Sequence, residues 1–146
     1  MFVKDVARYV VYYYNYNGWA ISNLKLQKIL YFLQADFLVN EGEPCFDEEI
    51  EAWDYGPVVP EIYHAYKFYG GNSIPCYEEG FGGYIFRKPR VDKMLIKCKP
   101  YSASQLVQAT HAQKPWIDAF HKGCGTVISK GSIRDYFLER KRQSNG

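Results

Sequence analysis

Residues 22–39 read Ser-Asn-Leu-Lys-Leu-Gln-Lys-Ile-Leu-Tyr-Phe-Leu-Gln-Ala-Asp-Phe-Leu-Val, and this stretch decides the fold. Ser22 or Asn23 can cap a helix here by accepting hydrogen bonds from its first backbone N–H groups, and Gly42 can end it. Apolar residues cover most sides of this helix, not only one stripe, and a helix of this kind is usually central. We therefore expect a central helix. Its core stripe has helical spacing and consists of Leu26, Ile29, Leu30, Leu33 and Phe37.

Helical patterns continue on both sides of this stretch. Apolar spacing predicts a helix from about Phe2 to Tyr14. Proline in the first turn, or a capping pair, indicates further helix starts. These starts are Pro60, Ser102 with Gln105, Pro115, and Ser132 with Asp135.

Two short segments are candidates for β-structure. Three glycines divide Ser73–Tyr77 from Tyr84–Arg87, which is typical of a β-hairpin or a loop. Residues 126–129 are apolar and β-branched and could form a short strand. We predict a mainly α, compact single-domain bundle over residues 1–146. It should have about five helices and a small β-hairpin or short strands.

The composition is that of an ordinary globular domain. A chain of 146 residues buries roughly 70% of its unfolded surface, so a stable core needs no metal, disulfide or cofactor. The four cysteines form no C-x-x-C pair, which argues against a zinc site. No signal peptide and no 18-residue apolar run occur. We therefore expect reduced thiols, a cytoplasmic location and no contact with a membrane.

The charges are unevenly distributed. Residues 1–72 carry five Lys and Arg against ten Asp and Glu, whereas residues 73–146 carry thirteen against six. The acids between Glu41 and Asp54 fail the EF-hand spacing and are interpreted as a solvated turn. Basic residues between Arg87 and Lys99, near Tyr84, Phe86 and Tyr101, could hold a nucleic-acid strand. Because the sequence pI is only about 8.3, we do not expect nucleic acid as the partner.

No catalytic pattern is present. The three histidines, His64, His111 and His121, belong to no nucleophile elbow, H-E-x-x-H motif or kinase motif set. His64 lies on the expected exposed side of its helix, and His111 falls near a helix end, where it could bind a carbonyl or favour the helix dipole. The sequence therefore favours a protein that is not an enzyme.

Three blocks of sequence resemble one family. Residues 24–31, Leu-Lys-Leu-Gln-Lys-Ile-Leu-Tyr, resemble the "LKLQKLLYY" helix of Panacea-domain proteins, which include the SocA-like and GepA-like groups. Residues 46–63 resemble the second block of that family, "FdeeieAWkyGPVvpevY". A weaker third block is matched by residues 104–106, 110–111 and 115–116. Residues 71–99 depart from the family pattern, so they could carry the choice of partner.

The resemblance implies an antitoxin of a toxin–antitoxin system, often encoded on prophages and other mobile genetic elements. Such a protein neutralises a cognate protein toxin by direct protein–protein interaction and has no catalytic residues or cofactor. At least one branch of the family acts as an adaptor that delivers its toxin to an AAA+ protease. Two alternatives therefore stay open: a protease adaptor, and a phage or mobile-element protein that binds a host protein or nucleic acid.

The second block also contains the candidate partner-binding residues. A rigid turn that carries two large aromatic side chains can either pin the central helix or present anchors to a partner, because binding hot spots favour Trp and Tyr. We expect Tyr55 to contact the partner and Trp53 to be buried. The full candidate set is Trp53, Tyr55, Gly56, Pro57, Val58 and Tyr63.

Overall fold

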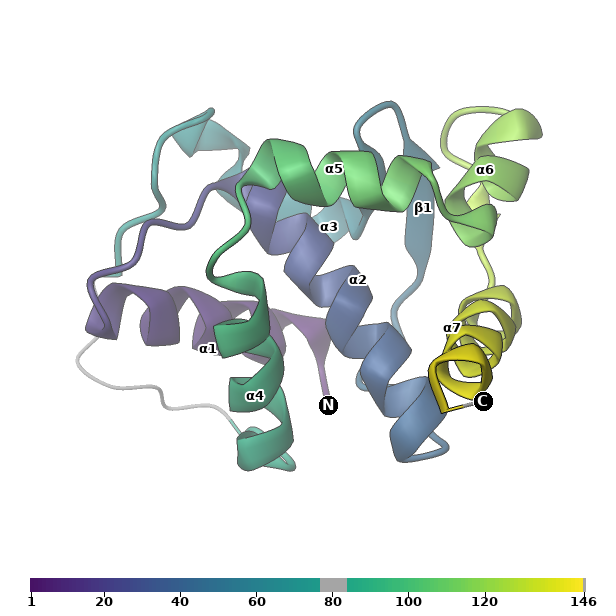
Figure 1. The fold of residues 1–146 in the computed structure, drawn as a ribbon. Helices are drawn as coiled ribbons and strands as arrows, with labels where there is room; N and C mark the ends of the chain where they lie inside the picture. The colour runs from purple at the N-terminus through teal and green to yellow at the C-terminus, as the bar shows by residue number, and fades with distance from the viewer. Residues whose placement is uncertain (77–83, 146) are drawn as a thin grey trace.

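The computed structural model describes residues 1–76 and 84–145, and it places helix α2 (Asn23–Asn40) in the middle of the molecule (Figure 1). The described residues form seven α-helices and a small sheet, so the predicted mainly α class is confirmed. The remaining elements are α1 (Val3–Tyr16), β1 (Ile50–Trp53), β2 (Gly56–Val58), α3 (Pro60–Tyr66), the 3-10 turn η1 (Lys67–Tyr69), α4 (Lys88–Cys98), α5 (Ala103–His111), α6 (Lys114–His121), β3 (Val127–Ile128) and α7 (Lys130–Asn145).

Helix α2 is central because nearly all of its surface is covered. Ser22 caps it: the Ser22 side chain accepts a hydrogen bond from the Lys25 backbone N–H at 3.2 Å. The whole predicted stripe is buried, and α1, α3, α4, α5 and α7 all pack on this helix. Burial of a leucine or isoleucine side chain contributes roughly 1.5–3 kcal/mol, so α2 supplies much of the core.

The sheet has three antiparallel strands in the order β2-β1-β3. Trp53 pairs with Gly56 at the hairpin end, and Ile50 pairs with Ile128 across the other edge. The predicted strand at 126–129 is confirmed, but the hairpin formed by β1 and β2 was not predicted. Its first strand lies in the segment interpreted as a solvated acidic turn. Alanine and glutamate are less common in strands than β-branched and aromatic residues, so the composition of this segment did not indicate β1, the strand that pairs with distant β3.

The segment from Ser73 to Arg87, expected to be a β-hairpin or a loop, is not a hairpin in the part that is described and agrees there with the loop. Residues 73–76 and 84–87 contain no strand, and the glycine-containing stretch 77–83 lies outside the described residues. From residue 88 the chain enters α4 instead, a helix that was not predicted. Its buried residues, Val91, Leu95 and Cys98, do have helical spacing, but basic residues dominate the segment around them.

The predicted number of about five helices was too low, since the described residues form seven. The predicted cap at Ser132 was also wrong. Helix α7 begins at Lys130, and Ser132 donates its backbone N–H to the side chain of Ser129 at 3.1 Å. By contrast, the predicted capping box at Ser102 and Gln105 is present, because the side chain of each residue accepts a hydrogen bond from the backbone N–H of the other. Within residues 1–76 and 84–145, no helix combines the length and hydrophobicity needed to cross a lipid bilayer.

Candidate partner-binding site

The hairpin tip at Trp53–Val58 is held against α2 by polar residues buried in that helix. The Lys28 side chain donates a hydrogen bond to the Pro57 carbonyl at 3.0 Å. The Val59 backbone N–H donates to the side-chain carbonyl of Gln27 at 2.9 Å. These bonds satisfy backbone groups that would otherwise be buried without partners, which costs about 1–3 kcal/mol for each group. The tip is therefore preformed and rigid.

Lys28 is fully buried, with 0% of its surface exposed. Burial alone lowers the pKa of its amine to about 7, because an ammonium group loses its hydration in the core. The amine therefore sits close to the midpoint of its titration at neutral pH and can bond the Pro57 carbonyl in either form. An apolar residue of the same length would fill the space but leave that carbonyl without this donor.

Gly56 brings the hairpin close to α2 and α5. Its φ is +105°, and a Cβ at this position would lie 2.7 Å from both Lys28 Cε and Thr110 Oγ1. Both neighbours are fully buried, so neither has free space into which to move. Only glycine has the backbone freedom and the lack of a side chain that this close approach requires.

The outer side of the tip is fixed by α5 and α6. His111 Nε2 lies 2.9 Å from the Asp54 carbonyl, so this ring nitrogen must carry the hydrogen, because a carbonyl only accepts. Trp116 donates its indole N–H to the Trp53 carbonyl at 2.8 Å. The rings of His111 and Trp116 are 4.2 Å apart between centroids. Of the two roles left open for His111 at its helix end, the structure shows a bond to a carbonyl, and that carbonyl belongs to the hairpin.

The structure gives the candidate residues different environments. Tyr55 is at the tip with 68% of its surface exposed, whereas Gly56, Pro57 and Val58 are buried and shape the turn. Trp53 is half-buried, not buried as predicted. Along β1 the side chains alternate: Ile50 and Ala52 point into the core, while Glu51 and Trp53 lie on the other face.

Trp53 and Tyr63 form a small aromatic surface beside the tip. Their ring centroids are 5.0 Å apart, and the exposed His64 ring lies 6.3 Å from Trp53. The indole N–H of Trp53 bonds the Glu51 carboxylate at 3.0 Å. With exposed Tyr55, these half-buried rings can supply rigid, amphipathic contact area. The described residues contain no group of His, Cys, Asp and Glu that could hold a metal ion.

Two supports of the site, Lys28 and Trp116, were not predicted as site residues. Both stand in sequence blocks that matched the family resemblance, but the pattern of the sequence does not say which residue the amine or the indole contacts. The Lys28–Pro57 contact joins residues that are 29 apart in the chain, and the Trp116–Trp53 contact joins residues that are 63 apart.

Residues 26–117 match the family model described as "Antitoxin SocA-like, Panacea domain". The chain belongs to this SocA-like Panacea-domain family. The matched region of this Panacea-domain protein begins in α2 and ends in α6, so it includes the hairpin and all its supports. The chain is also 36% identical over 124 residues to Antitoxin SocA of Caulobacter vibrioides (strain NA1000 / CB15N). That alignment covers 76% of this chain and 65% of the relative. No solved structure matches the chain.

Proposed function

We propose that this protein is an antitoxin that neutralises a separately encoded protein toxin by binding it directly, without catalysis. The observation that carries the proposal is the family match over residues 26–117. Similarity to a protein named Antitoxin SocA supports it. The geometry agrees with a binding role, because a rigid hairpin presents an exposed tyrosine at its tip and preorganised surfaces bind at lower entropic cost.

Co-expression tests the proposal. Each gene that neighbours the gene for this protein would be expressed alone, and then together with the Panacea-domain protein carrying an affinity tag. We expect one neighbour to stop growth alone, to be harmless in the pair, and to co-purify with the tagged protein. A steady toxin level in the pair would indicate sequestration, whereas toxin loss that requires an AAA+ protease would indicate an adaptor. Absence of any toxic neighbour that is rescued would contradict the antitoxin function.

The contribution of the hairpin tip is tested by Tyr55→Ala in the same assay. Because the Tyr55 side chain is mostly exposed, the variant should fold normally. We expect its affinity for the co-purifying toxin to fall by about tenfold, or roughly 1.4 kcal/mol. Tyr16→Ala is the matched control, because Tyr16 is 78% exposed at the end of α1 and away from the tip. Equal affinities for the two variants would show that Tyr55 is not an anchor.

A further inference from the structure

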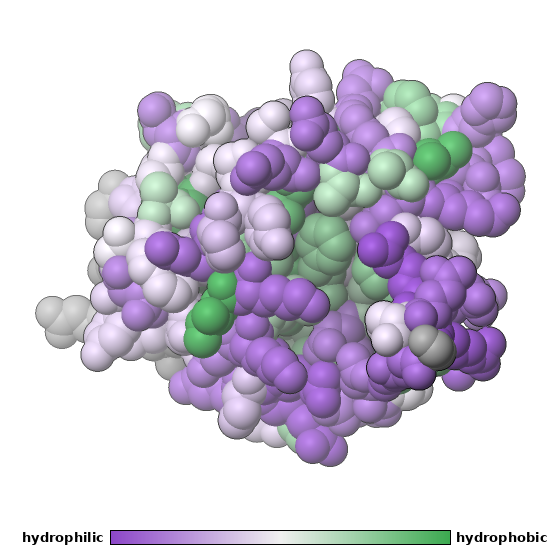
Figure 2. All heavy atoms as spheres, viewed as in Figure 1, coloured by the Kyte–Doolittle hydropathy of each residue, from purple (hydrophilic) through white to green (hydrophobic). Residues whose placement is uncertain are grey.

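A groove of about 910 Å³ lies over α2, with α4, α5 and α7 as its walls. Figure 2 shows it as a hollow with a green, hydrophobic floor and a largely purple, hydrophilic surround. It shares no lining residue with the hairpin tip. The two features are therefore separate surfaces of the molecule.

The floor of the groove is apolar and contains side chains that the core leaves partly uncovered. Phe32 from α2, Met94 from α4 and Phe137 from α7 are only half-buried. Two further lining residues come from α5: Leu106, which is buried, and Ala109, which is exposed. Large apolar side chains of a partner could be buried here at roughly 25 cal/mol for each Å² removed from water.

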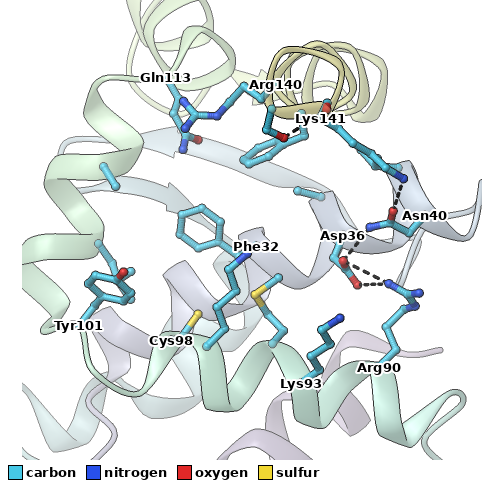
Figure 3. A pocket seen from close by; sticks show the side chains of 18 of the residues that line it. Phe32, Asp36, Asn40, Arg90, Lys93, Cys98, Tyr101, Gln113, Arg140 and Lys141 are labelled. Atoms are coloured by element: carbon cyan, nitrogen blue, oxygen red, sulfur yellow. Dashed lines mark hydrogen bonds and ion pairs between the residues drawn. The ribbon is translucent and has the colours of Figure 1, made fainter. Parts of the chain in front are cut away.

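The rim of the groove is basic. The lining residues include five Lys and Arg but one acid, Asp36. Asp36 is already occupied, because Arg90 binds it at 3.0 Å (Figure 3). Arg90 also binds Glu41, at 2.6 Å. Lys93 and Lys97 stand one turn apart on α4, are exposed, and form no ion pair with any residue in the described ranges.

The opposite wall adds two further cations. On α7, the Arg140 guanidinium donates to the Tyr136 hydroxyl, at 2.8 Å. The Lys141 ammonium donates to the side-chain carbonyl of Asn40, at 2.7 Å. Both charges are exposed and uncompensated within residues 1–76 and 84–145. An occupant that lies between α4 and α7 therefore meets positive charge on both sides.

We propose that this groove binds an acidic amphipathic helix of the protein partner, which is the toxin if the proposed function holds. Such a helix would lie on α2 between α4 and α7 and direct its apolar stripe into the floor. Its flanking carboxylates would meet Lys93 and Lys97 on one wall and Arg140 and Lys141 on the other. Charge complementarity of this kind selects the partner and orients it, more than it adds affinity.

The floor does not suit a nucleic acid. Non-specific binding of single strands uses aromatic faces on which bases can stack. Here the Phe32 and Phe137 rings contact each other edge to face, with centroids 6.2 Å apart and planes at 86°. Both also pack edge to face on Tyr31. These rings are committed to one another, which leaves Tyr101, 50% exposed at the edge, as the one aromatic ring among the described lining residues that is open to a base. A single ring does not form a platform on which successive bases stack.

A peptide titration tests the proposal without the toxin. The probe is a fluorescently labelled helical peptide of about four turns, with leucine on one stripe and glutamate elsewhere. A second peptide replaces every glutamate by lysine, and a thymidine oligonucleotide is the third probe. We expect the acidic peptide to bind the wild-type protein at least about tenfold more tightly than either of the others. Its affinity should fall as salt is added, because exposed charges are screened.

Two variants of the groove should weaken binding of the acidic peptide by about tenfold or more. Lys93→Glu/Lys97→Glu reverses one wall, and Ala109→Trp fills the trough from an exposed position. The matched control, Lys4→Glu/Lys122→Glu, changes the net charge equally at exposed residues outside the groove. Circular dichroism would confirm that each variant is folded.

Three results would overturn the groove proposal: no saturable binding of the acidic peptide, equal weakening by the control, or tighter binding of the oligonucleotide. The co-expression assay separates this inference from the antitoxin function. If the groove variants rescue a toxic neighbour as well as the wild type does, the groove is not the toxin site while the antitoxin function stands. If no neighbour is rescued but the peptide results hold, the antitoxin function fails and the groove still binds acidic helices.

Discussion

Gly56 is the residue at which the hairpin and the helical core come closest. We expect Gly56→Ala to lower the free energy of unfolding by about 2–4 kcal/mol, because the new Cβ has a strained φ and overlaps two buried side chains. Urea denaturation would measure this change in the free energy of unfolding. Gly71→Ala is the control, since Gly71 has open space around it and its substitution should change stability by less than about 0.5 kcal/mol. A small effect at both positions would mean that the hairpin can move away from α2.

Lys28 should make stability depend on pH. Because burial lowers the pKa of its amine to about 7, the folded chain releases a proton above this pH, while the unfolded chain keeps it until about pH 10.4. The unfolding free energy must therefore rise with pH in this window, by up to about 1.4 kcal/mol per pH unit for this group. The lowered pKa of Lys28 therefore makes the folded state less stable as pH falls from about 10.4, and this loss is complete once the pH has fallen through about 7.

Lys28→Met removes this titration, so it provides the measurement. We expect the wild type to gain stability relative to Lys28→Met as pH rises from about 6 to about 8.5. Burial raises the pKa of the Cys45 thiol to about 12 and that of the Cys98 thiol to about 11, which opposes the trend at higher pH. Both thiols are present in both proteins, so their effect cancels in the difference. Parallel pH profiles would show that the amine stays charged in the core.

At the scale of single elements, helix α5 depends on its first turn. The side chain of Ser102 accepts the Gln105 backbone N–H at 3.1 Å, and the Gln105 side chain accepts the Ser102 N–H at 2.8 Å. We expect Ser102→Ala to reduce the unfolding free energy by about 1 kcal/mol. Ser104→Ala, two residues further along and also exposed, should cost nothing, since alanine favours a helix interior. Equal thermal midpoints for the two variants would contradict the capping role.

At the scale of the whole molecule, α2 contacts helices from both halves of the chain, so we predict that residues 1–146 unfold as one domain. Tryptophan fluorescence reports on two separate regions, Trp19 beside α1 and the neighbouring pair Trp53 and Trp116 at the hairpin, and far-ultraviolet circular dichroism reports on the helices. Both signals should change in a single coincident transition. Leu30→Ala, in the centre of α2, should lower the free energy of unfolding by about 2–5 kcal/mol, and by the same amount whichever signal is used to measure it. Two separated transitions would show that the chain contains independent units.

The local sequence pattern was sufficient to predict a structural feature wherever the residues that define it lie within a few positions of one another. The α2 stripe, the Ser22 cap and the Ser102–Gln105 box all concern neighbours within one or two helical turns, and all are present. The family resemblance directed attention to Trp53–Val58 because that block is continuous in the chain. The exposed side of α3 at His64 was also predictable, since it follows from the helical period.

Contacts between distant segments decided what the pattern left open. Besides its neighbour β2, strand β1 pairs with distant β3, where Ile50 meets Ile128, and no local propensity contains that second pairing. The burial of Gly56, Pro57 and Val58 follows from Lys28 and Thr110 lying against the turn. The groove, too, arises only when α2, α4, α5 and α7 are assembled. A sequence specifies local periodicity and capping directly, whereas burial and charge complementarity depend on which surfaces the completed fold brings together.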